Sequence, residues 1–413
     1  MPKRASGKAL MFLVLLIALD DVAGGGASPA LPGMIASFPD WPVEVIQSLV
    51  SLPSFAAVIV GLMFGKLTEK FSKRSLLFFG MIIFMIGGIA PAFLNSMPMI
   101  IIARAIIGFG LGITLPMSMN LIDDFWSGKT RDILMGVGNT SMAAIGGIIF
   151  QFGGGLLAVA DWHHAYWVYL FPIIILVPMI LWLPEPAVKA HAEVKVLKPE
   201  EQANMSRADK GQLTFPILAG TLIQILISAQ ILGVISNLPL VIVSEGLGDP
   251  ATIGIVLSAL TLATFPAGLF FGHYKAAFKK YYLPVSYIIA GLGVSIQYIS
   301  HSMSGIIVGC VVMGLSMGLL LPGMYSRMSD IASKAQMSLG MGFVVVGQGF
   351  GQFIGPYYNS IVTVQILGLE IGRASIRTAA IGFITVGILW AIWMTIRGDV
   401  ADRLQKSRSD IAA

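Results

Sequence analysis

The stretch Gly61–Leu76, GLMFGKLTEKFSKRSL, returns in altered form at Gly268–Leu283 as GLFFGHYKAAFKKYYL. Seven of the sixteen positions are identical without a gap, and the copies are 207 residues apart in a chain of 413. A segment that recurs half a chain length later indicates an internal repeat.

The repeat extends over further segments of the chain. The offset of 207 pairs Ala30-Leu31-Pro32 with Asn237-Leu238-Pro239. An offset of 206 pairs GFGLGITLP at Gly108–Pro116 with GLSMGLLLP at Gly314–Pro322. Matches at nearly one offset predict two halves of the same design and the same orientation.

The composition indicates a membrane protein. The chain is 56% hydrophobic and 11% charged, whereas soluble domains carry about 25% charged residues. Apolar runs of about 20 residues recur along it, and each is long enough to cross a bilayer as a helix. We predict an all-α polytopic fold with twelve spans, at 9–37, 44–65, 75–95, 98–122, 132–158, 165–183, 213–243, 251–272, 282–301, 304–325, 337–362 and 374–396.

The basic residues predict the orientation, because Lys and Arg are enriched on the cytoplasmic side. With both termini in the cytoplasm, the cytoplasmic segments hold 23 of the 26 basic residues. Arg104 lies inside a span, and Arg373 and Arg377 lie outside. We expect a multi-pass protein of the plasma (inner) membrane, surrounded by lipid. The net charge of +5 follows from this topology and does not indicate a nucleic-acid partner.

The only long polar linker in the sequence is the charged segment 184–212, which begins with Pro184-Glu185-Pro186. We divide the chain into a six-helix bundle over 1–183, a cytoplasmic linker over 184–212, and a second bundle with a short cytoplasmic tail over 213–413. Parallel halves related by an axis along the membrane normal are typical of secondary transporters, which bind substrate near the midplane between them.

Three motifs resemble the major facilitator superfamily. Its loop between spans 2 and 3 reads approximately G-x-L-x-D-R-x-G-R-R, and residues 65–74 read GKLTEKFSKR. DWHHAYW at 161–167 is similar to its D-W-R-x-x-F stretch, and its span 4 pattern R-x-x-x-G-x-G-x-G stands as Arg104, Gly108, Gly110 and Gly112. The resemblance covers essentially the whole chain. It implies two pseudo-symmetric six-helix bundles that work by alternating access.

In that family the loop between spans 2 and 3 latches the halves in one state. The resemblance therefore assigns gating roles to Gly65, Glu69, Lys70, Lys73 and Arg74. Glycine permits close helix approach, and Glu69 can pair with the basic cluster or cap a neighbouring helix. The second copy has alanine at the position of Glu69, so the latch is expected to be one-sided. The alternative is that the basic residues only fix the topology.

Asp20 and Asp21 are acidic residues near the middle of a span. They lie about 16–18 Å along the first span, near the midplane, and ionisable residues there are functional candidates. The helix neighbours of Asp21 are small or polar, so Asp21 is our first candidate for a proton carrier. Asp20 is then its partner or pairs with Arg104. The alternative is that Arg104 holds both aspartates charged to fix helix packing.

The second half lacks these groups, because Ile227 and Ser228 match the two aspartates and Cys310 matches Arg104. Its polar groups near mid-span are neutral. Glutamine amides both donate and accept hydrogen bonds, so they suit either substrate binding or contacts between helices. The candidates for substrate binding are Gln224, Ser228, Gln348 and Gln352.

The direction of transport has weaker support in the sequence. Exporters of the family often carry G-x(8)-G-x(3)-G-P-x(2)-G in span 5; here Gly138 and Gly147 fit, but Gln151-Phe152 replace Gly-Pro. Near the middle of the spans, two acids stand against one base, which favours protons or cations. We predict proton-coupled efflux of a small amphipathic or cationic compound, with Arg104 tuning the aspartates. The alternative is uptake, by proton symport or uniport, of a small organic anion that Arg104 contacts.

No enzymatic chemistry is predicted. GLSMG at 314–318 matches the hydrolase pattern G-x-S-x-G, but it lies inside a span rather than at a strand–turn–helix. His163-His164 in an external loop are interpreted as a solvated pair rather than a metal site. Without a nucleotide-binding motif, an ion gradient must supply the energy. We expect no cofactor or metal, protons and a small molecule as partners, and a monomer.

Overall fold

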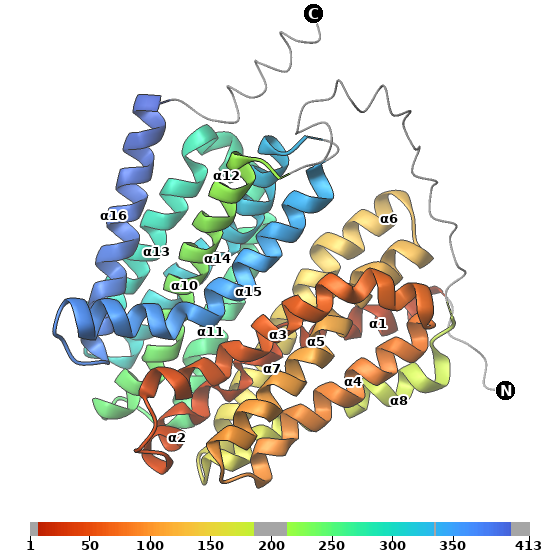
Figure 1. Cartoon of the computed structure of the whole chain (residues 1–413), viewed down its shortest axis with the longest axis horizontal. Coiled ribbons are helices and arrows are strands. Elements are labelled where there is room, and N and C mark those ends of the chain that lie inside the picture. Colours follow the sequence, from red (N-terminus) through yellow and green to blue (C-terminus); the bar gives the residue numbers. More distant parts are fainter. Residues whose placement is uncertain (1–6, 186–212, 334–335, 398–413) are drawn as a thin grey trace, which may run out of the picture.

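The computed structural model describes residues 7–185, 213–333 and 336–397. Within these ranges every regular element is a helix. Figure 1 shows two groups of helices: α1–α8, coloured red to yellow, form the first half, and α10–α16, green to blue, form the second. Most of the predicted linker, 186–212, lies outside the described residues, so the exact division stays a prediction.

The first half begins with a first span in three pieces and continues with long helices. The elements are α1 (Gly7–Leu16), η1 (Ile17–Ala30), α2 (Leu31–Ser37), α3 (Val43–Lys70), α4 (Lys73–Ile89), η2 (Ala90–Phe93), α5 (Met97–Phe125), α6 (Gly128–Ile133), η3 (Leu134–Gly138), α7 (Asn139–Ala158), η4 (Trp162–Leu170) and α8 (Ile173–Trp182).

The second half begins with one continuous helix in the corresponding place. Its elements are α10 (Phe215–Ser244), α11 (Pro250–Leu269), α12 (Phe271–Phe278), η5 (Lys279–Tyr281), α13 (Tyr282–Ile299), α14 (Met303–Ile331), α15 (Met337–Ser360), η7 (Ile361–Ile366) and α16 (Arg373–Arg397).

Ten helices of the described residues are long and apolar enough to cross a membrane, and a bent pair, Gly7–Asp20 with Val22–Ser37, makes eleven. These eleven coincide with predicted spans. The remaining predicted span, 337–362, falls on α15, a 24-residue helix that is not among them. The all-helical, membrane-spanning fold is confirmed, and the count of twelve stays a prediction.

Local sequence explains where several helices begin. The Ser72 hydroxyl accepts a hydrogen bond from the amide of Ser75 and starts α4. Asp249 and Thr252 form a capping box at the start of α11, and proline occupies its first position. Such caps satisfy amide groups that the first helical turn leaves without partners. Short polar loops can therefore reverse the chain between neighbouring spans.

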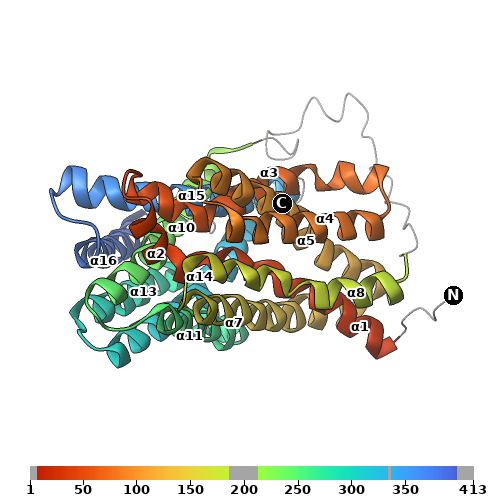
Figure 2. The ribbon, with the colours of Figure 1, turned by 90° about the horizontal axis from the view of Figure 1, so that it is seen from below.

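Each half buries its own apolar core. One cluster of buried residues draws on residues 217–383 of the second half, and two others draw on residues 14–183 of the first. The halves meet where α7 packs on α11 and α3 packs on α15. Figure 2 shows α7 lying beside α11. In Figure 1 the halves approach each other around α2 and stand farther apart toward α6 and α12.

Candidate functional site

The first span is broken where the two aspartates lie. Its segments, Gly7–Asp20 and Val22–Ser37, are bent by 43° relative to each other. The 3-10 helix η1 is fourteen residues long and contains three consecutive glycines and a proline. Runs of 3-10 helix longer than about four residues are uncommon and often mark a hinge. Interrupted helices at membrane depth also form the binding sites of many transporters.

Asp20 lies at the end of the first segment and is fully buried. A carboxyl group in such a place must be neutral, paired or hydrogen-bonded. The side chain of Asp21 lies outside the described residues. Which of the two aspartates carries the proton therefore stays a prediction.

Arg104 of α5 holds the broken segment from the side. Its side chain is fully buried and donates hydrogen bonds to the carbonyl of Gly24 at 2.9 Å, to the carbonyl of Leu49 at 2.7 Å and to the Tyr169 hydroxyl at 2.9 Å. The Tyr169 hydroxyl in turn donates to the carbonyl of Ala23 at 2.9 Å. These donors satisfy two carbonyls of η1, so the geometry gives Arg104 a backbone-holding role that the sequence did not suggest.

Glycines of α7 allow it to pack on η1 without intervening side chains. A Cβ on Gly146 would lie 1.9 Å from the Leu19 carbonyl oxygen, and one on Gly154 would lie 2.4 Å from that of Gly26. Real Cβ contacts are essentially never this short. Helix α7 thus packs directly against the backbone of η1, which carries Asp20 and Asp21 and is called the aspartate segment below.

Polar and aromatic contacts join the two halves. Thr261 of α11 donates to the Gln151 side chain of α7 at 3.0 Å. Gln47 of α3 donates to the Ser236 carbonyl at 3.1 Å and to the Asn237 side chain at 3.2 Å. In addition, the Tyr357 hydroxyl donates to that of Ser48 at 3.3 Å, and the rings of Phe55 and Phe353 stack at 4.9 Å.

These contacts lie toward one end of the molecule, which we name the α2 end. Helix α2 terminates there, and α3 and α11 start there. The opposite end, where α3 and α11 terminate and α12 starts, is named the α12 end. The contacting residues of α3, 47–55, all lie in the part of that helix nearest the α2 end. The halves are therefore joined from the α2 end to about the middle of the helices.

The predicted gating residues lie at the α12 end. Glu69 and Lys70 are exposed, and a Cβ on Gly65 would meet nothing within 4 Å. The close helix approach expected at Gly65 is therefore absent in this conformation. Lys73 forms an ion pair with Asp124 at 2.6 Å, and Arg74 donates a hydrogen bond to the carbonyl of Ile180. Both contacts stay within the first half.

The second half has a related ion pair, between Lys275 and Asp330 at 3.0 Å. Asp124 and Asp330 occupy equivalent positions, because the 206-residue offset of spans 4 and 10 continues to them. Sequence reasoning missed both acids. Extending that alignment by eight residues would have found them.

The glutamines of the second half divide into two kinds. Gln224 is fully buried in α10 and donates to Ser228 at 3.1 Å, and its side-chain oxygen makes no hydrogen bond within the described residues. Gln348 and Gln352 of α15 are half-buried.

The packing of α15 shows where Gln348 and Gln352 point. A Cβ on Gly347 would lie 3.0 Å from the Thr221 carbonyl of α10, and one on Gly349 would lie 2.3 Å from Val58 of α3. With about 100° per residue, Gln348 falls in the sector between α10 and α3, and Gln352 lies about 40° away from it. Both amides therefore lie on the part of α15 between its contacts with α10 and with α3.

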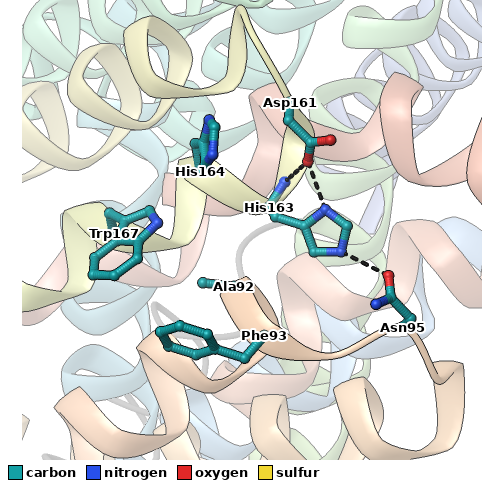
Figure 3. A pocket seen from close by; sticks show the side chains of 7 residues that line it. All are labelled: Ala92, Phe93, Asn95, Asp161, His163, His164 and Trp167. Atoms are coloured by element: carbon teal, nitrogen blue, oxygen red, sulfur yellow. Dashed lines mark hydrogen bonds and ion pairs between the residues drawn. The ribbon is translucent and has the colours of Figure 1, made fainter.

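A pocket of about 400 Å³ lies where the candidate spans Lys73–Phe93 and Trp162–Trp182 end and begin, near the α2 end (Figure 3). The ring of His163 contacts Asp161 at 2.5 Å and Asn95 at 3.0 Å through its two nitrogens. Hydrogen bonds from the backbone and ring of His163 hold the pKa of the Asp161 carboxyl below its ordinary value. His163 is hydrogen-bonded to Asp161 and Asn95 and partly exposed, and His164 is exposed. The described residues contain no cluster suited to a metal ion.

Comparison with known proteins supports the reading of the fold. The family model described as Major Facilitator Superfamily matches residues 10–227 and again 217–411. The two matches together cover nearly the whole chain. Each match covers about one of the halves that the repeat predicts.

Curated relatives include multidrug transporters and a 4-hydroxybenzoate transporter. "Multidrug transporter protein MdtP" of Bacillus subtilis is 28% identical over 39% of this chain and 29% of its own length. "4-hydroxybenzoate transporter PcaK" of Acinetobacter baylyi is 28% identical over 42% of this chain and 38% of its own. "Multidrug efflux pump SdrM" of Staphylococcus aureus is 26% identical over 53% and 46%. The matched region is less than half of each relative.

Solved structures resemble this one along nearly the whole chain. A peptide transporter POT in complex with sulfate superposes with a TM-score of 0.70 at 13% identity, covering 96% of this chain and 97% of that one. A D-xylose-proton symporter superposes with a TM-score of 0.64 at 15% identity, covering 92% and 96%. At such identities the likeness concerns the fold alone.

Proposed function

We propose that this chain, which belongs to the major facilitator superfamily, exchanges protons for a small amphipathic or cationic compound. The observation that carries the proposal is the fully buried Asp20 in a span that is broken at its aspartates. A carboxyl group at such a place can load and release a proton as its surroundings change. Asp21 is the first candidate for the carrier, and Asp20 is its partner.

The second half would supply the neutral part of the substrate site. Gln348 and Gln352 lie on α15, which packs against both α10 and α3, and the side-chain oxygen of Gln224 makes no hydrogen bond within the described residues. Amides can both donate to and accept from a polar substrate. In this proposal the first half binds the charge and the second half orients the rest of the compound.

In this proposal the chain crosses the membrane twelve times, with α15 as the eleventh span, and both termini lie in the cytoplasm. The α12 end then faces the cytoplasm, and the contacts of Gln47, Ser48 and Phe55 close the outer side. This arrangement corresponds to an inward-facing state with the Glu69 latch released. Outward opening would break these contacts and bring the latch together.

Uptake of a small organic anion is the second candidate, and the PcaK relative favours it. In our alternative reading Arg104 would contact the anion. Arg104 is fully buried, however, and already donates to three acceptors around η1. This use of its donors makes the cationic substrate the stronger proposal.

Proton movement in liposomes tests the proposal. Purified protein is reconstituted, and the luminal pH is followed while tetraphenylphosphonium, other lipophilic cations or 4-hydroxybenzoate is added outside. Antiport predicts that a transported cation drives protons out and makes the lumen alkaline. Luminal acidification with 4-hydroxybenzoate would instead establish symport. Substrate entry without any pH change would contradict proton coupling.

A further inference from the structure

One side chain touches both the aspartate segment and the opposite half. Gln151 of α7 is 8% exposed, and its Oε1 accepts a hydrogen bond from the Thr261 hydroxyl of α11 at 3.0 Å. Its Nε2 lies 3.2 Å from where a Cβ on Gly25 of η1 would be. Gln151 therefore sits between the broken span and the second half.

The backbone around Gln151 makes the same connection. A Cβ on Gly147 would lie 2.7 Å from Thr261 and 3.2 Å from Val22, the residue that follows Asp21. On the same face of α7, a Cβ on Gly155 would lie 2.6 Å from the Pro250 carbonyl of α11. Little side-chain volume separates α7 from either neighbour. A shift of η1 against α7 would therefore disturb the contact of α7 with α11.

The sequence of α7 differs from the exporter pattern at this contact. Gln151 and Phe152 stand where Gly-Pro is typical. Glycine has no side chain that could accept a hydrogen bond from Thr261. This chain thus has a polar link between its halves that the pattern does not provide.

The helices that pack against η1 carry few ionisable residues near its middle. None occurs in α7, α10 or α11, and those of α3 lie in its first two and last five residues. Arg104 of α5 and Tyr169 of η4 bond to carbonyls of η1, and Tyr166 stacks on Tyr169. A change in the charge of an aspartate therefore acts mainly on the packing of η1 against these groups and α7.

We propose that Gln151 is a positioning residue that couples the charge state of the aspartate segment to the packing of the second half. The inference rests on the proposed function, because it requires a proton to bind at Asp20 or Asp21. Gln151 itself does not titrate. By holding Thr261 while it lies against Gly25, it makes the position of α11 depend on the conformation of η1.

The test measures how the two halves respond to pH, which needs no substrate. Lys129→Cys on α6 and Ala277→Cys on α12 are both exposed and lie on opposite halves at the α12 end. Spin labels are attached to them in a Cys310→Ser background. The distance between the labels is measured by electron–electron double resonance in liposomes across a pH series.

The background should show two distance populations whose ratio changes with pH. In Gln151→Leu that pH response should be lost or its midpoint displaced, with the population ratio changed about threefold, as for one interhelical hydrogen bond. Thr261→Val should reproduce the effect, and the double variant should add nothing to it. Thr261→Val is a small change, so it keeps the test valid if Gln151→Leu folds poorly.

Gln230→Leu is the matched control. Gln230 is 2% exposed and bonds to Tyr287 at 2.7 Å and to Tyr358 at 3.3 Å, all within the second half. Its removal should leave the pH response intact. An unchanged response in both Gln151→Leu and Thr261→Val would overturn the inference alone. A background without any pH response would overturn the inference together with proton coupling at the aspartates.

Discussion

Span 1 and span 7 occupy equivalent places in the two halves and differ in their backbone. Span 1 is divided into α1, η1 and α2 with a bend of 43°, whereas α10 is one helix of 30 residues. The helices packed against them, α7 and α15, nevertheless both place glycine against the backbone of the span. A Cβ on Gly351 of α15 would lie 2.4 Å from the Ile225 carbonyl of α10, just as Gly146 of α7 abuts Leu19.

The difference shows that close packing alone does not unwind a helix. Both spans lie against a glycine face, but the broken one carries Asp20 and Asp21, and donors from Arg104 and Tyr169 satisfy its carbonyls. The continuous span carries neutral residues at the equivalent positions. We infer that the fold concentrates titratable chemistry in one half and keeps the other regular.

The largest expected effect is the loss of proton flux when the proposed carrier in span 1 is replaced, with span 7 as the comparison. Asp21→Asn removes the proposed carrier, so substrate-driven proton flux in liposomes should fall to the level of protein-free vesicles. Ser228→Ala, at the equivalent place in span 7, should keep the flux coupled. Asp20→Asn serves as the comparison within span 1. Full coupled flux in Asp21→Asn would assign the proton to another group.

The next effect concerns the support of the broken segment. Arg104→Gln should destabilise the protein by on the order of 3 kcal/mol, because hydrogen bonds to a charged group are lost around a buried carbonyl. Its counterpart Cys310→Ala removes a small buried thiol and should cost about 1 kcal/mol or less. Denaturation in detergent, followed by tryptophan fluorescence, measures both. Equal costs would contradict the supporting role of Arg104.

Replacing the glycines that pack against the two spans should destabilise both halves alike. Gly146→Ala and Gly351→Ala each place a Cβ against a backbone carbonyl, so each should destabilise by about 1–3 kcal/mol. Gly65→Ala is the control, because it meets open space and alanine is the better helix former. Thermal unfolding in detergent gives the order. A neutral Gly146→Ala would mean that α7 and η1 are not in close contact.

The smallest effect concerns the ion pairs at the α12 end. Lys73→Gln and Lys275→Gln each break one pair, and partly exposed pairs contribute about 0.2–1 kcal/mol. Lys73→Gln should cost more, because the side chain of Asp124 is 7% exposed and that of Asp330 is 31% exposed. Unfolding measured at low and high salt separates the charge contribution. A larger loss in Lys275→Gln would contradict this ranking.

Hydropathy and the internal repeat predicted the helical membrane fold, since burial in lipid leaves few other backbone arrangements. Periodic patterns could not reveal the break in span 1. The sequence of η1 contains three consecutive glycines and Pro29, whereas Ser236 stands at the position of Pro29 in α10 and only one of the three glycines recurs there. This difference is a signal in the sequence, but it does not show that Arg104 and Tyr169, from distant parts of the chain, bond to the carbonyls of the broken span.

The sequence indicated which kinds of residue are candidates for the site, but not which contacts they make. The cost of charge in lipid singled out Asp20 and Arg104, and both are fully buried. That Arg104 holds backbone carbonyls depends on how three helices pack, which one sequence does not contain. The same applies to Gln151, which the sequence shows only as a departure from a glycine pattern.

The two ion pairs at the α12 end use the same acid position but different lysine positions of the repeat. Asp124 and Asp330 fall at equivalent positions, but their partners do not, because the repeat pairs Lys73 with Lys280 rather than with Lys275. Both copies therefore carry lysine at the matched position, but in the second half a lysine five residues earlier makes the ion pair. The two halves tie this loop to the following long helix through the same acid and through different lysines, so the tie tolerates a change in which loop residue makes it.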